Sequence, residues 1–134
     1  MGRVRDFFRS LAGICDTERL DDTLWEIREG RAAVPLGRVP QLGPAGGAVY
    51  LAGKGLKKPI LLMNAGGGGY LAYTNACTHG GRKLDPASDG RGLRCCSVNH
   101  STFDLDGAKT GGPAKGPLTT HEVEEREGTL LISL

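Results

Sequence analysis

Two short stretches decide how this chain is built: Cys77-Thr78-His79-Gly80-Gly81 and Cys96-Ser97-Val98-Asn99-His100-Ser101-Thr102-Phe103-Asp104. Each stretch holds one cysteine and one histidine, and sixteen residues separate His79 from Cys96. Thiolate and imidazole groups are ligands for transition metals. In extended chain, the two-residue step from Cys77 to His79 points both side chains to the same face. The pattern therefore predicts one metal centre held between two loops.

Composition limits what such a chain can be. Its 134 residues fit one domain with a short appendage, and its 22 glycines and 7 prolines favour short strands and turns. A net charge of +2, without a basic run interleaved with aromatic residues, argues against nucleic-acid binding. No apolar run approaches the ~18 residues of a membrane span, and the first ten residues lack a secretory core. We therefore expect a cytoplasmic protein, in which the presence of four cysteines suggests metal binding before disulfides.

Residues 1–30 differ from the remainder in being charged and poor in glycine. Apolar residues recur there at helical spacing: Val4, Phe7, Phe8, Leu11 and Ile14. Asp16 or Thr17 is a candidate cap for a second short helix through Leu20, Leu24, Trp25 and Ile27. This helical arm either packs on its own domain, docks a partner subunit or a sister chain, or lies on a membrane surface.

From about Ala33 onwards the pattern changes to short strands and turns. The runs 48–52, 60–64, 70–75, 93–96, 103–109, 121–126 and 129–134 read as strands or hairpins, and Gly66–Gly69 joins two of them. The proline-containing runs that begin at Val34 and Val39 read as extended. Short strands at this spacing predict an all-β sandwich or barrel over residues 31–134.

The ligand pattern and its surroundings resemble the Rieske [2Fe–2S] family. Beyond Cys77-Thr78-His79, the resemblance includes Ser101-Thr102-Phe103-Asp104 and a proline loop at Gly112-Pro113-Ala114 and Pro117-Leu118. It covers about residues 34–134. It implies an antiparallel β fold with two loops that hold a [2Fe–2S] cluster through two thiolates and two imidazoles. The ligands it implies are Cys77, His79, Cys96 and His100.

One position departs from the family pattern. The histidine expected three residues after Cys96 is Asn99, and His100 follows one residue late. Three alternatives follow: His100 is the ligand after a small loop adjustment, Asn99 or a water replaces it, or the site holds zinc or nothing. A structural Cys₂His₂ zinc site normally pairs cysteine with cysteine and histidine with histidine, unlike the mixed pairs here.

The other cysteines and the third histidine are secondary candidates. Cys95 and Cys96 are adjacent, so in a strand they point to opposite faces and one of them reaches the metal. Position favours Cys96, which leaves Cys95 as a small core residue and Cys15 as a spectator thiol. His121 belongs to the last strands and is expected to be exposed or structural.

The resemblance also bears on the redox potential. Quinol-oxidising relatives carry an additional disulfide and a membrane anchor; Arg82 and Val98 occupy the places of those two cysteines, which favours the ferredoxin-like branch. Ser101 matches the family serine that donates to a cluster sulfur, whereas Val98 replaces the family tyrosine that does the same. Fewer donors imply a midpoint in the lower part of the range for such centres, roughly −150 to +300 mV.

These observations predict a one-electron carrier rather than an enzyme, since the sequence offers no catalytic base, nucleophile or substrate pocket. The expected partners are redox proteins or sister subunits of a larger oxidoreductase complex, contacted in part through residues 1–30, which also offer a route to a homo-oligomer. The alternative is a structural or assembly module that keeps the fold without redox activity.

Overall fold

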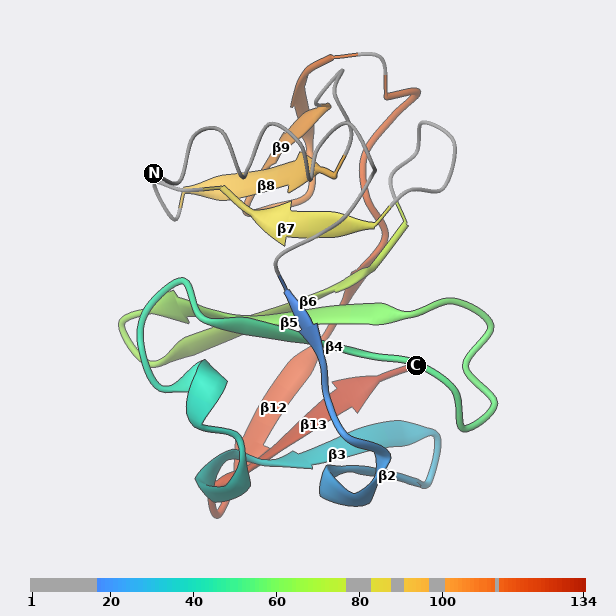
Figure 1. Ribbon diagram of the computed structural model, residues 1–134, viewed down its shortest axis with the longest axis vertical. Helices are drawn as coiled ribbons and strands as arrows, with labels where there is room; N and C mark the ends of the chain where they lie inside the picture. Colours follow the sequence, from blue (N-terminus) through green and yellow to red (C-terminus); the bar gives the residue numbers. More distant parts are fainter. Residues whose placement is uncertain (1–16, 77–82, 88–90, 97–100, 113) are drawn as a thin grey trace.

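The computed structural model describes residues 17–76, 83–87, 91–96, 101–112 and 114–134, and these form three stacked β layers (Figure 1). The upper sheet has the order β10(Lys109–Gly111), β9(Thr102–Asp104), β8(Gly92–Cys95), β7(Leu84–Pro86). The middle sheet has the order β1(Glu18–Arg19), β4(Ala48–Leu51), β5(Ile60–Gly66), β6(Gly69–Thr74), β11(Thr120–His121). The lower sheet has the order β12(Val123–Arg126), β13(Thr129–Ser133), β3(Arg31–Pro35), β2(Glu26–Arg28).

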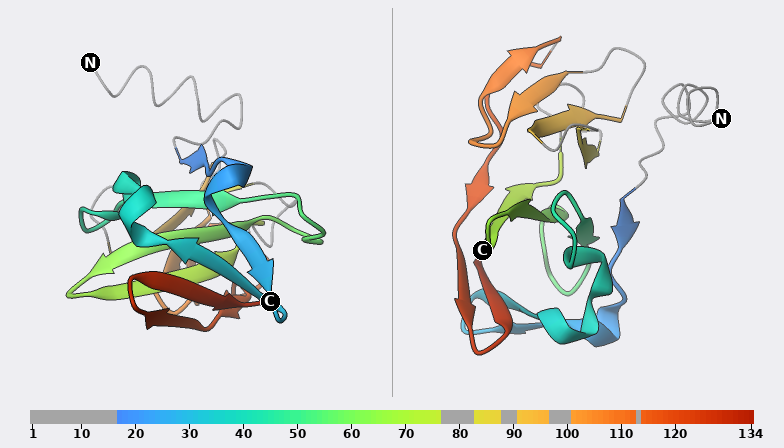
Figure 2. Two further views of the ribbon diagram at one scale, coloured as in Figure 1. Left: turned by 90° about the horizontal axis from the view of Figure 1, so that it is seen from below. Right: turned by 90° about the vertical axis from the view of Figure 1, so that its left-hand side faces the viewer.

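The middle sheet is buried on both faces, and strand β5 shows why. Ile60 and Leu62 belong to the core below it, whereas Leu61 and Met63 belong to the core above it. All four side chains are almost completely buried. Because successive side chains of a strand point to opposite faces, one apolar run supplies two cores. The layers seen in Figure 2 are therefore held together through this strand.

The predicted all-β architecture and its hairpins are confirmed. β5 pairs antiparallel with β6 across the Gly66–Gly69 turn, where Gly66, Gly67 and Gly68 have positive φ angles. β12 and β13 form the last hairpin, and β9 pairs with β10. The β9–β10 turn is fixed by the Asp104 carboxylate, whose Oδ1 accepts hydrogen bonds from the backbone amides of Asp106 and Ala108 at 2.9 and 3.0 Å.

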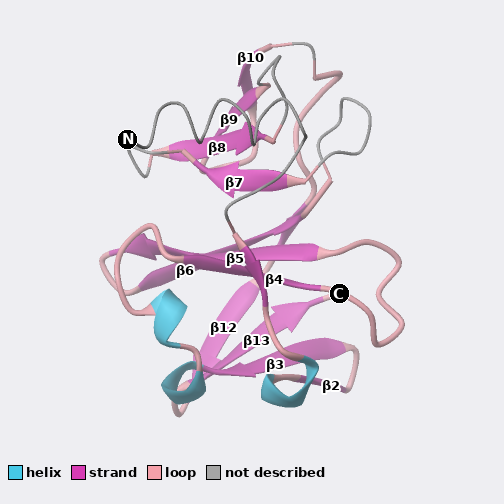
Figure 3. Cartoon of the chain, viewed as in Figure 1, coloured by secondary structure: helices cyan, strands magenta, loops and turns pink. Residues whose placement is uncertain are grey.

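The prediction of a second helix is wrong. Residues 18–28 form β1, the three-residue 3₁₀ turn η1(Asp22–Leu24) and β2, and the cap is Asp21 rather than Asp16 or Thr17. The short helical pieces are drawn in Figure 3. Leu20 and Trp25 are buried in the lower core, and the Leu20 amide donates to the Tyr50 carbonyl oxygen at 2.8 Å. Tertiary burial and strand pairing thus override a weak helical period. The first predicted helix, residues 4–14, lies outside the described residues.

The proline-containing runs are only partly extended. Pro35 ends strand β3, but Leu36–Arg38 and Pro40–Leu42 form the 3₁₀ helices η2 and η3. Pro40 stands at the start of η3, where its missing N–H and fixed φ angle are compatible with a helical turn. Leu42 at the end of that turn is buried in the lower core, which gives the turn a packing role.

Tyr73 joins the middle and upper layers. Its ring is buried in the upper core, and its hydroxyl donates to the Leu105 carbonyl oxygen at 2.5 Å. Burial, followed by the charges of Asp106 and Asp104, raises the pKa of Tyr73 from 10 to about 12. A raised pKa in the folded state means that the protonated hydroxyl contributes fully below pH 10, and that this contribution is lost as the pH rises through 12.

We predict that Tyr73→Phe lowers the free energy of unfolding by about 1 kcal/mol at pH 8, the usual worth of one such hydrogen bond. The variant should also lose less stability than the wild type as the pH rises from 10 to 12. Urea unfolding across that pH range measures both effects. Tyr70→Phe, on the same strand and half-buried, is the matched control. Parallel pH profiles for Tyr73→Phe and wild type would contradict the prediction.

Candidate iron–sulfur site

The segment that carries Cys77 and His79 is tied at both of its ends. At the first end, the Asn75 backbone amide donates to the Pro59 carbonyl oxygen at 2.7 Å. The side chain of Asn75 then reaches across the segment, because its Oδ1 accepts from the Leu84 backbone amide at 2.8 Å. Asn75 is only 2% exposed, so this bond is shielded from water. One buried side chain therefore closes the first predicted ligand segment.

The segment that carries Cys96 and His100 is closed in a similar way and is joined to the first. The Cys95 amide donates to the Ser101 carbonyl oxygen at 2.8 Å, which brings the two ends of the second segment together. The Cys96 amide donates to the Lys83 carbonyl oxygen at 2.9 Å. Lys83 stands at the end of the first segment, and Cys96 stands at the start of the second. This hydrogen bond therefore brings the two predicted ligand segments together beside β7 and β8.

The two adjacent cysteines have different surroundings. Cys95 belongs to the upper core, together with Leu93 of the same strand. Cys96 follows the end of β8 and is not part of that core, although it is 1% exposed. The prediction that Cys95 is a core residue is confirmed.

Ser101 offers a test of whether a cluster fits here. Its side chain is completely buried, and its Oγ has no hydrogen-bond partner. A buried hydroxyl without a partner costs about 1–3 kcal/mol, so native proteins rarely leave one. Ser101 directly follows the second predicted ligand segment, at the position that matches the donor serine of the family. An acceptor such as a cluster sulfur would satisfy it, and the residues present therefore fit a cluster.

His121 is engaged elsewhere. Its Nδ1 donates to the Ser133 carbonyl oxygen at 2.8 Å, and its Nε2 accepts from the Thr74 hydroxyl at 3.0 Å. Because a carbonyl oxygen only accepts, the Nδ1 atom must carry the proton, which leaves the Nε2 lone pair for Thr74. Both ring nitrogens are therefore occupied in tying β11 to its neighbours, and the prediction of a structural role agrees with this geometry.

The remaining predicted site residues, Cys77, His79, Asn99 and His100, lie outside the described residues, as does Cys15. In the described part of the chain, no three His, Cys, Asp or Glu side chains are gathered as a metal site would need. Within that same part, no helix is both long and apolar enough to cross a bilayer.

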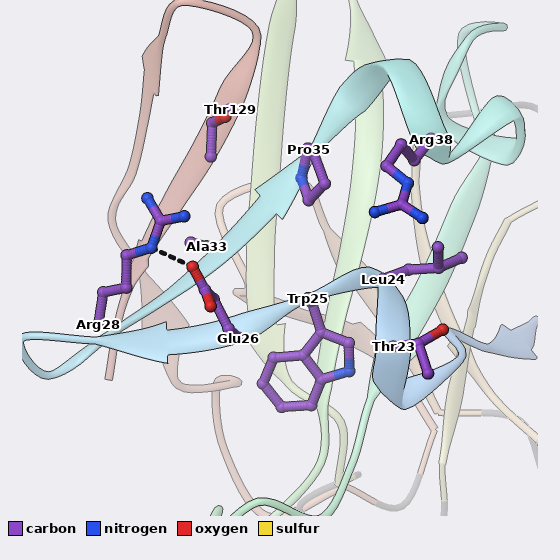
Figure 4. Close-up of a pocket in the computed structure, with 9 residues that line it drawn as sticks. All are labelled: Thr23, Leu24, Trp25, Glu26, Arg28, Ala33, Pro35, Arg38 and Thr129. Carbon is purple, nitrogen blue, oxygen red and sulfur yellow. Dashed lines mark hydrogen bonds and ion pairs between the residues drawn. The ribbon is translucent and has the colours of Figure 1, made fainter.

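The pocket drawn in Figure 4 has the wrong chemistry for iron. It encloses 220 Å³ beside β2 and β3, at the end of the molecule away from β7 and β8. Its charged lining residues are Glu26, Arg28 and Arg38, and Glu26 is paired with Arg28. The lining includes neither cysteine nor histidine. This pocket is therefore not an alternative site for the cluster.

Comparison with known proteins now identifies the family. The model of the Rieske [2Fe-2S] domain matches residues 34–122. The chain belongs to the Rieske [2Fe–2S] domain family. Its cofactor is therefore a [2Fe–2S] cluster. No curated protein matches the chain.

Solved structures of Rieske proteins and ferredoxins share this fold. The plasma membrane Rieske protein PetC3 from Synechocystis PCC 6803 is 22% identical with a TM-score of 0.58, over 72% of this chain and 94% of that one. The ferredoxin of carbazole 1,9a-dioxygenase from Nocardioides aromaticivorans IC177 is 17% identical with a TM-score of 0.60, over 75% and 93%. A ferredoxin from Sphingomonas yanoikuyae B1 is 26% identical with a TM-score of 0.59, over 70% and 93%.

Sequence reasoning did not find the residues that close the two segments. Asn75 and Lys83 bind no metal themselves, and their role depends on hydrogen bonds to Leu84 and Cys96. An asparagine at the end of a strand, two residues before a predicted ligand, was the available signal. It is ambiguous, because asparagine is common at strand ends and turns for local reasons.

We predict that Cys96→Ala abolishes assembly of the cluster, whereas Cys95→Ala retains it. The Cys95 variant should lose only about 1 kcal/mol of stability, because it removes a small buried group from the upper core. Iron and sulfide are measured per chain after anaerobic reconstitution under a thiol reductant. If Cys96→Ala retained iron and Cys95→Ala lost it, Cys95 would be the ligand and Cys96 would not.

Proposed function

We propose that this protein is a one-electron carrier that serves as the electron-transfer component of a larger oxidoreductase system. The observation that carries the proposal is that the two predicted ligand segments are joined. The Cys96 amide donates to the Lys83 carbonyl oxygen, and Cys96 is buried. Membership of the Rieske family supports Rieske-type electron transfer. A bound [2Fe–2S] cluster supplies reversible uptake and release of one electron.

The ligands that we propose are Cys77 and Cys96 for one iron and His79 and His100 for the other. Two observations support this set. The chain has three histidines, and both ring nitrogens of His121 are already hydrogen-bonded. The hydrogen bond between Cys95 and Ser101 closes a short segment that contains His100 at its last position. We propose that this closure accommodates the one-residue displacement from the family pattern.

The described residues around the segments have a protective role in this proposal. Ala114 and Leu118, from the predicted proline loop, are buried in the upper core with Leu84 and Phe103. They exclude water from the side of the site that faces the core. Ser101 would donate its hydroxyl to a cluster sulfur and favour the reduced state, which carries more negative charge. Electron exchange then takes place at the histidine side.

We propose that the partner is an oxygenase or another multi-subunit redox enzyme, acting in the cytoplasm. Support comes from the fold shared with the ferredoxin of carbazole 1,9a-dioxygenase. We propose that the arm at residues 1–30 contacts a partner or a second copy, and that residues 31–134 form the Rieske domain. Residues 18–28 contribute strands β1 and β2, so the part of the arm to test is 1–16.

We predict that the anaerobic, dithionite-reduced protein gives an EPR signal with the low average g value of mixed Cys/His ligation. His100→Ala should abolish or alter this signal. His121→Ala is the control and should leave it unchanged, because His121 is engaged with Thr74 and Ser133. A signal that survives in His100→Ala and is lost in Asn99→Ala would transfer the ligand role to Asn99. A protein with zinc or without metal, and without a signal, would support the structural module instead.

We also predict that removal of residues 2–16 leaves the cluster and its EPR signal intact but weakens association. Thr17 must be kept, because its amide and hydroxyl donate to Asp85 Oδ1 at 2.9 and 2.6 Å. Light scattering of the full and shortened chains, each loaded with iron, measures any self-association. Equal masses for the two chains would contradict contact with a second copy. Unchanged affinity for a redox partner would contradict the arm as a subunit contact.

A further inference from the structure

Two buried donors without partners flank the predicted ligand segments. In the described part of the chain, the buried polar side-chain atoms that lack a hydrogen bond are Trp25 Nε1, Gln41 Oε1, Asn75 Nδ2 and Ser101 Oγ. Asn75 stands two residues before Cys77, and Ser101 directly follows His100. Unsatisfied buried donors are uncommon because burial removes their water. One such donor stands beside each of the two segments, which the Cys96–Lys83 hydrogen bond joins, and this indicates a buried acceptor at the site.

The orientation of the Asn75 amide follows from its neighbour. Its oxygen must face the Leu84 N–H, since a backbone amide only donates, and the distance is 2.8 Å. The two N–H bonds of Nδ2 therefore remain without an acceptor. Asn64 provides the contrast, because its Nδ2 donates to the carbonyl oxygens of Leu42 and Gly43 at 2.9 and 3.2 Å. Of the two asparagines in the described part of the chain, the one beside the ligand segment is therefore the one whose Nδ2 lacks a partner.

We propose that Asn75 Nδ2 donates a hydrogen bond to a sulfur of the [2Fe–2S] centre, either a bridging sulfide or a ligand thiolate, and thereby raises its midpoint potential. This inference rests on the proposed function. Sulfur that carries negative charge accepts hydrogen bonds, and a donor stabilises the reduced state more than the oxidised state. The donor tyrosine of the family is replaced by Val98, so Asn75 compensates from the other segment.

Asn75 then has two separable tasks. Its Oδ1 closes the first segment through Leu84, which is a structural task, whereas its Nδ2 acts on the potential. Asn75→Asp keeps an oxygen for Leu84 and removes the donor, but it adds negative charge. Asn75→Leu removes the donor without adding charge, but it also loses the closing bond. The missing donor is the one change that the two variants share, so the ¹⁵N coupling of the wild type is measured beside the potentials.

The experiment combines potentiometric titration with pulsed EPR of the reduced protein labelled with ¹⁵N in its asparagine side-chain amides. We expect both Asn75 variants to shift the ratio of oxidised to reduced centres at fixed potential by about tenfold, equivalent to about 59 mV for one electron. We also expect a ¹⁵N coupling in the wild type that persists in Asn64→Asp and Asn99→Asp. Ser101→Ala is the positive control for loss of a donor.

The outcomes are distinct. A shift in Asn75→Asp alone is an effect of charge and overturns the proposal, and a shift in Asn75→Leu alone is an effect of the lost closure and also overturns it. If neither Asn75 variant holds iron, the ¹⁵N coupling decides the question. A coupling that persists in Asn64→Asp and Asn99→Asp leaves Asn75 as its source. A wild type without a ¹⁵N coupling overturns the inference. A wild type without any reduced-cluster signal refutes the proposed function itself and this inference with it.

Discussion

The burial of strand β5 on both faces is the constraint on which the remainder of the fold depends. Ile60 and Leu62 face the lower core, and Leu61 and Met63 face the upper one. Truncating one buried leucine to alanine typically costs 2–5 kcal/mol, a large share of the stability of a small domain. Because the strand alternates between two cores, neither outer sheet can be displaced without exposing apolar surface in the middle sheet. The upper sheet, which bears the site, is therefore placed by the same residues that hold the lower one.

Hydrogen bonds donated by backbone amides hold the described part of the site together. Leu84 N–H to Asn75 Oδ1 closes the first predicted ligand segment, and Cys95 N–H to the Ser101 carbonyl oxygen closes the second. Each closure is short in sequence, so little chain entropy is lost in forming it. Cys96 N–H to the Lys83 carbonyl oxygen then joins the two. Hydrogen bonds that close the ends of both segments are what a redox centre needs if its surroundings are to change little between its two charge states.

The start of the described chain connects the layers a second time. Thr17 donates twice to Asp85 of β7 in the upper sheet, and Glu18–Arg19 pair in parallel with β4 in the middle sheet. Leu20 and Trp25 then enter the lower core, and Figure 1 shows this blue segment crossing the stack. Residues 17–25 are thus integral to all three layers. A contact arm, if confined to 1–16, would be attached to the molecule next to the upper sheet.

The sequence by itself determined the family, the all-β class and the hairpins, because these follow from local rules. Glycine runs turn, alternating apolar residues pair as strands, and the Cys-x-His spacing is written in the chain. It also assigned Cys95 to the core, because adjacent residues of a strand point to opposite sides and position favours Cys96 as the ligand. Tertiary structure decided what local rules could not. The helical period around Leu20 and Trp25 gave way to strand pairing and burial, and the roles of Asn75 and His121 depend on partners 9 and 47 residues away. Hydrogen bonds over such separations exist only once the layers have packed, so no local pattern encodes them.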